Sequence, residues 1–192
     1  MSAKATILAA IAANQPGPRT LPQLPPDPSP DRVELQATFR RVLAGSKTTS
    51  LDPHELPDYL TDNFGGDQTI VSARPEVPGT LDLATISDPL QLAGVDLVVL
   101  TAQLGVAENG AMWVDEADFG GQRVLPFITQ HLILFVPAER IVATMHQAYR
   151  QVEIGKTGFG VFIAGPSKTA DIEQSLVIGA HGPRSLAVVV ER

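Results

Sequence analysis

Phe159-Gly-Val-Phe-Ile-Ala-Gly-Pro-Ser-Lys-Thr169, with the later run Ser185-Leu-Ala-Val-Val-Val-Glu191, is the part of the chain that decides its fold class. Both runs are continuously apolar, which is typical of buried strands, and the Gly-Pro pair ends the first of them. Ser167 and Thr169 are favourable N-cap residues, so a helix is expected to follow them. Gly179 would end that helix before the last strand begins. A strand, a polar loop, a helix start and a return strand predict a βαβ unit.

Similar apolar runs occur earlier in the chain. Asp96-Leu-Val-Val-Leu-Thr101 and His131-Leu-Ile-Leu-Phe-Val136 predict two more buried strands, and residues 138–151 have the apolar spacing of a helix. The short distance from Thr101 to Met112 predicts one hairpin inserted between them. Alternating strands and helices indicate an α/β fold, with three α/β/α layers and a mostly parallel sheet.

The N-terminal half contributes further elements. Residues 31–44 and 52–64 are expected to be helices, and residues 69–73 a strand. The first thirteen residues predict an amphipathic helix, and residues 15–30 hold seven prolines in sixteen positions, which predicts an extended connector. We therefore expect an N-terminal helix and connector over residues 1–30 and one domain over residues 31–192. The N-terminal arm is a candidate contact for a second subunit.

Composition excludes several classes of function. The net charge of −7 argues against nucleic acid as the main partner, because a phosphate backbone requires a basic surface. The chain contains no cysteine, so disulfides, thiolate catalysis and an iron–sulfur cluster held by its own thiolates are excluded. No run approaches the roughly 18 apolar residues of a membrane span. We expect a soluble, cytoplasmic protein with no membrane partner.

The polar loop after the strand at residues 159–164 is a candidate anion site. Gly165 opens the loop, the hydroxyls of Ser167 and Thr169 could donate hydrogen bonds, and Lys168 could add charge-assisted attraction. Two acids that follow, Asp171 and Glu173, would satisfy the helix dipole themselves and repel an anion. A ligand-binding loop and a plain helix cap therefore both remain open.

Three further residues are candidates for catalysis. His181 and Arg184 flank a Gly-Pro turn, where they could present a proton donor and a carboxylate-binding fork. Glu108 lies at a strand-end turn and could act as a nucleophile or base, although Asn109-Gly110 beside it suits a plain hairpin. His131 opens a buried strand. Glu108, His131 and His181 lack the short ligand spacing of a metal site, so no metal is predicted.

Taken together, Ala107-Glu-Asn-Gly110, His131, Gly165-Pro-Ser-x-Thr-Ala-Asp-Ile-Glu173 and Gly179-Ala-His-Gly-Pro-Arg184 resemble the LUD-domain family, in its lactate-utilisation protein C branch. The resemblance implies a fold similar to the NagB/RpiA/CoA-transferase superfamily. It also implies a part in oxidising L-lactate to pyruvate beside partner subunits that carry the iron–sulfur clusters. This chain has Asn109 and Ala111 at two positions where the family usually has threonine.

Three functional hypotheses follow. In the first, the chain is a non-redox subunit that binds a small carboxylate, another anion such as phosphate, or a partner in a cleft near the carboxyl ends of the strands. The residues that would hold and orient the ligand are Gly165, Ser167, Lys168, Thr169, His181 and Arg184, with Glu108 and His131 on the opposite wall. In the second, the chain is an acyl- or CoA-transferase with Glu108 as nucleophile. In the third, it is an interaction module whose motif is structural.

Overall fold

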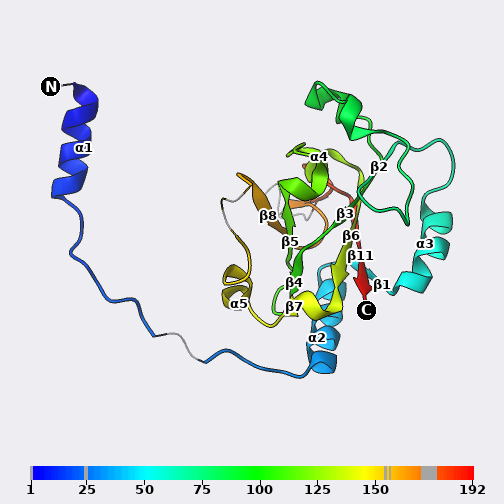
Figure 1. Ribbon diagram of the computed structural model, residues 1–192, viewed down its shortest axis with the longest axis horizontal. Coiled ribbons are helices and arrows are strands. Elements are labelled where there is room, and N and C mark those ends of the chain that lie inside the picture. The colour runs from blue at the N-terminus through cyan, green and yellow to red at the C-terminus, as the bar shows by residue number, and fades with distance from the viewer. Residues whose placement is uncertain (1, 24–25, 154, 156, 170–176) are drawn as a thin grey trace.

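A five-stranded parallel sheet forms the centre of the computed structural model, which describes all residues except 1, 24–25, 154, 156 and 170–176 (Figure 1). Its spatial order is β1-β11-β6-β3-β2, and every neighbouring pair is parallel. The strands are β1 (Thr49–Leu51), β2 (Ile70–Ser72), β3 (Leu97–Thr101), β6 (His131–Pro137) and β11 (Ser185–Glu191). The α/β class with a mostly parallel central sheet, predicted from the apolar runs, is confirmed.

The sheet is covered on both faces, and alternate residues along each strand point to opposite faces. One face packs against α2 (Arg32–Gly45) and a second sheet, around Phe39, Leu134 and Val188. The other face packs against α3 (Leu56–Asn63), around Ile133 and Val189. Both helices begin where the sequence predicts, at Asp31 and, through a 3-10 turn at residues 53–55, at Asp52.

The second sheet has four strands in the order β7-β4-β5-β8. They are β4 (Leu104–Val106), β5 (Met112–Asp115), β7 (Ile141–Val142) and β8 (Gly160–Ile163). The predicted hairpin is confirmed, because β4 and β5 pair antiparallel and Asn109 at the turn accepts a hydrogen bond from the N–H of Ala111 at 3.0 Å. The expectation that β8 joins the parallel sheet is wrong, since β8 pairs antiparallel with β5.

The helix predicted over residues 138–151 is present only as a short segment. Residues 138–151 divide into a 3-10 turn, strand β7 and the short helix α5 (Met145–Tyr149). The β-branched pair Ile141-Val142 is better suited to a strand, and it pairs in parallel with β4. Other short elements are α4 (Leu125–Ile128) and 3-10 turns at residues 83–85, 89–92 and 116–119.

The helix expected after Gly165 is wrong at both of its described ends, and residues 170–176 between them lie outside the described residues. Lys168 and Thr169 form β9, which pairs antiparallel with β10 (Val177–Ile178), so the chain doubles back on itself. Thr169 therefore takes part in strand pairing, and the backbone of Ser167 hydrogen-bonds to Pro183 and Gly179. Asp171 and Glu173, the acids that entered the prediction, lie outside the described residues.

The N-terminal helix and the first part of the connector stand away from the domain, whereas Asp27 and Pro28 contact it (Figure 1). The helix predicted there is present as α1 (Ala3–Ala13), but none of its residues is buried, and Ile7, Leu8 and Ile11 are each more than half exposed. The described part of the connector has no helix or strand, as its prolines predict. Among the described helices, none combines the length and apolar character needed to cross a membrane.

Candidate functional site

A cavity of about 180 Å³ opens at the amino ends of β6 and β11. Leu132 and Leu186, the second residue of each strand, form its floor, and α4 and β8 provide its sides. Most of its walls are apolar, and the polar side chains that line it are those of Ser167 and His181. The cleft was predicted at the carboxyl ends of the strands, whereas this cavity lies at the amino ends of β6 and β11.

Two segments of the predicted motif are joined beside this cavity by backbone hydrogen bonds. The N–H of Ser167 donates to the carbonyl of Pro183 at 2.9 Å, and the carbonyl of Ser167 accepts from the N–H of Gly179 at 3.0 Å. The N–H of Arg184 donates to the carbonyl of Gln130 at 2.7 Å. These bonds place residue 167 beside the turn that carries His181, where a Cβ at Gly182 would lie 3.4 Å from Oγ of Ser167.

A pair of lysines adds positive charge at the same loop. Gly165 has a φ of 80°, and a Cβ there would lie 2.5 Å from Nζ of Lys168, so the glycine makes room for the ammonium group. Partial burial, and then the positive charge of Lys47, lower the pKa of Lys168. Lys47 lies in the loop after α2, whose Ser46 carbonyl would be 3.2 Å from that Cβ. Two positive charges close together favour an anionic ligand nearby.

Comparison with known proteins assigns the family. Residues 87–190, more than half of the chain, match the LUD domain. The chain belongs to the LUD-domain family. A crystal structure of a DUF162 family protein from Deinococcus radiodurans has the same fold, with a TM-score of 0.63 and 19% sequence identity over 85% of this chain and 100% of that one.

Several relatives of this LUD-domain chain bear the name lactate utilization protein C. The one from Deinococcus radiodurans is 29% identical, over 86% of this chain and 97% of its own length. The one from an Exiguobacterium species is 31% identical, over 82% of this chain and 77% of its own length. The one from Geobacillus kaustophilus is 29% identical, over 82% of this chain and 69% of its own length. The resemblance seen in the sequence motifs is confirmed.

The structure brings some of the predicted site residues together and separates others. Gly165, Ser167 and His181 line the cavity. Lys168 lies against Gly165, and Thr169 pairs with Val177 in the β9–β10 hairpin. Arg184 is exposed, and its Cγ would lie 2.5 Å from a Cβ at Gly179, so its side chain passes over that turn.

His131 does not share the cavity. It precedes Leu132 on β6, and successive side chains of a strand point to opposite faces, so His131 faces α3. Its Nδ1 lies 2.8 Å from Oγ of Ser185, and its ring meets that of Phe64 edge-on at 5.2 Å. Burial, followed by the nearby cation of Arg184, lowers the pKa of His131, while the carboxylate of Asp96 opposes them.

This environment predicts a pH-dependent stability. The folded protein holds His131 with a pKa below its unfolded value of about 6.5, so protons bind preferentially to the unfolded chain. We expect the free energy of unfolding, measured with urea, to fall as the pH is lowered from 7.5 to 5.5. His131→Asn should reduce that slope, whereas His54→Asn, at an exposed position, should leave it unchanged. Equal slopes in all three proteins would contradict the assignment to His131.

Glu108 also lies outside the cavity lining. Its Oε1 accepts a hydrogen bond from the N–H of Met145 at 2.7 Å, at the start of α5, and its own N–H donates to the carbonyl of Ala143 at 3.1 Å. The carboxylate thus joins the end of β4 to α5. These contacts give Glu108 a structural role. Its role as a nucleophile stays a prediction.

Sequence reasoning missed part of the site. Phe127 on α4 and Phe162 on β8 line the cavity, and Lys47 lies beside Lys168. Phe127 and Phe162 belong to apolar runs that suit a buried core equally well, so no local signal marks them. Lys47 has a φ of 63°, which is unusual for a non-glycine residue. The sequence around Lys47 does not predict this backbone conformation.

Proposed function

We propose that this protein acts in lactate utilisation and holds a small carboxylate, lactate or pyruvate, in the cavity at the amino ends of β6 and β11. The single observation that carries the proposal is the meeting of Gly165, Ser167 and His181 at one small cavity. These residues come from the motif that relates the chain to proteins named lactate utilization protein C.

The size and chemistry of the cavity suit such a ligand. Its volume of about 180 Å³ is below the roughly 300–1,000 Å³ of pockets for drug-sized molecules. Lactate carries a carboxylate, a hydroxyl and a methyl group. The Ser167 hydroxyl would donate to the carboxylate, with Lys168 adding attraction, and His181 at the rim would contact the hydroxyl. Phe127 and Phe162 would surround the methyl group.

Oxidation of lactate to pyruvate releases two electrons and two protons, so the reaction requires an electron acceptor. Cysteine thiolates are the usual ligands of iron–sulfur clusters, and the sequence has none. We therefore assign the electrons to iron–sulfur clusters of partner subunits. The part of this chain is to bind and orient the carboxylate.

Replacing Ser167 by alanine tests the proposal. The hydroxyl is removed while both backbone hydrogen bonds of residue 167 are kept, so the fold should persist. A hydrogen bond to a charged group contributes about 1.5 kcal/mol or more, so we expect roughly tenfold weaker binding of lactate or pyruvate. Calorimetric titration of the purified protein measures this change.

Ser87→Ala is the matched control, because Ser87 is an exposed serine that does not line the cavity. It should bind both ligands as the unmodified protein does. Absence of binding heat in the unmodified protein at millimolar lactate and pyruvate would refute the carboxylate site. Equal affinity of the Ser167→Ala and Ser87→Ala variants would refute the role of the serine hydroxyl.

A further inference from the structure

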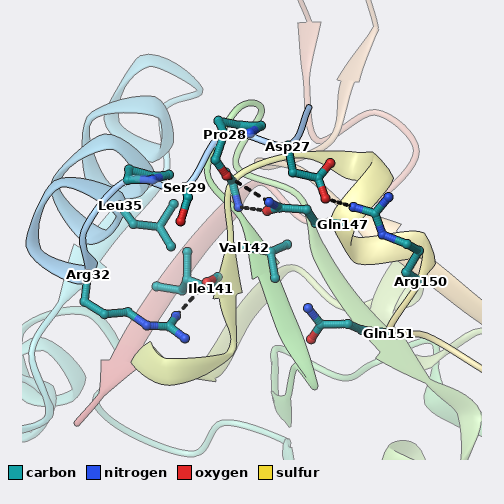
Figure 2. Close-up of a pocket in the computed structure, with 12 residues that line it drawn as sticks. Asp27, Pro28, Ser29, Arg32, Leu35, Ile141, Val142, Gln147, Arg150 and Gln151 are labelled. Atoms are coloured by element: carbon teal, nitrogen blue, oxygen red, sulfur yellow. Dashed lines mark hydrogen bonds and ion pairs between the residues drawn. The ribbon is translucent and has the colours of Figure 1, made fainter. Parts of the chain in front are cut away.

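A second, larger pocket of about 520 Å³ lies on the domain surface where the connector joins it (Figure 2). Two regions far apart in the sequence enclose it. The first is the end of the connector at residues 27–30 with the first turn of α2, and the second is strand β7 with α5 and the residues after it. Its volume falls within the roughly 300–1,000 Å³ of small-molecule sites. None of its lining residues lines the cavity of the proposed function.

The floor and rim of this pocket differ in character. Leu35, Ile141 and Val142 provide an apolar floor, and Arg32 and Arg150 lie on opposite sides, with Gln147 between them (Figure 2). Such a mixture suits an organic molecule with charged or polar ends.

The polar side chains are held in place by contacts that leave donors free. Nη1 of Arg32 donates to the carbonyl of Ile141 at 3.0 Å, which uses one of the five N–H donors of a guanidinium. The Gln147 amide donates to the carbonyl of Pro28 at 3.0 Å and accepts from the N–H of Ala143 at 2.7 Å. A pre-positioned guanidinium loses less freedom when it binds a carboxylate or phosphate.

The connector itself supplies a carboxylate to this pocket. Asp27, the acidic residue of the lining, forms an ion pair with Nη2 of Arg150 (Figure 2). Both side chains are about half exposed, at 56% for Arg150 and 43% for Asp27, so the pair is accessible to exchange. The Asp27 carboxylate thus marks the position where Arg150 receives an oxyanion.

We propose that this pocket binds an organic anion, whose carboxylate or phosphate displaces Asp27 from Arg150 and whose other end reaches Arg32. Binding would then break the ion pair between the connector and Arg150, while the hydrogen bond from Gln147 to Pro28 remains. The connector acts as an internal competitor, and ligand affinity depends on how firmly Asp27 holds Arg150. This site is independent of the proposed lactate site.

Replacing Asp27 and replacing Arg150 are expected to change ligand affinity in opposite directions. This difference distinguishes a binding site from an ion pair that only holds the connector in place. Asp27→Asn removes the competing charge, and we expect about threefold tighter binding of succinate or inorganic phosphate. Arg150→Gln removes the receiving group, and we expect about tenfold weaker binding. If the pair served only to fix the connector, both variants would have the same effect.

Calorimetric titrations at constant ionic strength measure these changes, with succinate, inorganic phosphate and the neutral succinamide as probes. Asp67→Asn and Arg41→Gln are matched controls that alter exposed charges outside the pocket lining. They should leave the affinity within about twofold of the unmodified value. Tighter binding of succinate than of phosphate identifies a carboxylate ligand, and the reverse order identifies a phosphate ligand.

Three results would overturn the proposal: no binding heat for either anion even with Asp27→Asn, equal binding of succinamide, or weaker binding in both the Asp27 and Arg150 variants. Ser167→Ala, titrated in parallel, should leave affinity for succinate at this pocket unchanged. The Asp27 and Arg150 variants therefore test this pocket, and the Ser167 variant tests the proposed lactate site, so failure of one proposal can be distinguished from failure of the other.

Discussion

Replacement of Phe39 by alanine is expected to lower the free energy of unfolding by about 3–5 kcal/mol. Phe39 is fully buried on α2, and its ring contacts the backbone of β4 so closely that a Cβ at Gly105 would lie 3.0 Å from Cζ. The ring fills the space between α2, the central sheet and the second sheet. Removing it leaves a cavity at the junction of three elements, which cannot all move inward together.

Urea unfolding followed by circular dichroism measures this loss. Val33→Ala is the matched control, since it shortens an apolar side chain on the same helix at a position that is 79% exposed, and it should change stability by less than about 0.5 kcal/mol. A loss below about 1 kcal/mol for Phe39→Ala would mean that α2 does not pack as described. A changed urea dependence would instead indicate an altered unfolded state.

The predictions that succeeded rest on signals contained in short segments. Apolar runs at residues 96–101, 131–136 and 185–191 became three adjacent strands of the parallel sheet, because residues buried on both faces of a sheet must be apolar throughout. Helix α2 begins at its predicted cap, where Asp31 accepts from the N–H of Glu34 at 2.8 Å. In both cases the local preference and the tertiary structure agree.

The failures share a cause, which is pairing with distant segments. The run at residues 159–164 resembles a central strand, but its partner is β5, whose identity the run does not encode. Ser167 and Thr169 suit a helix cap, yet residue 167 bonds to Pro183 and Gly179, and Thr169 pairs with Val177. At residues 167 and 169, hydrogen bonding to distant segments therefore outweighed the local preference for a helix cap.

The site was predictable to a similar degree. The motif contained Gly165, Ser167 and His181, which meet at the cavity, because β9 and β10 pair antiparallel between them. It could not assign His131 to the opposite face, since that requires knowing which residue of β6 points inward. The pocket beneath residues 27–30 was not predicted, because it forms where a proline-rich connector meets α5.

Replacement of Gly160 by alanine is the second change with a large expected effect. A Cβ at residue 160 would lie 2.1 Å from Cζ2 of Trp113, a distance at which atoms overlap. Trp113 is 6% exposed and packs against Phe162 at 4.8 Å between ring centroids, so its indole has little room to move. We expect a loss of about 3 kcal/mol in the free energy of unfolding, from overpacking of the second sheet.

The effect should reach the cavity as well, because Gly160 begins β8 and the same strand carries Phe162 and Ile163 into the cavity wall. Gly94→Ala is the matched control, since a Cβ there meets nothing within 4 Å, and it should remain within about 0.5 kcal/mol of the unmodified protein. Trp113→Phe removes the atom that clashes, so adding Gly160→Ala to that variant should cost clearly less than adding it to the unmodified protein. An equal cost in both backgrounds would show that the indole is not the obstacle, and that β8 is constrained at residue 160 by its backbone instead.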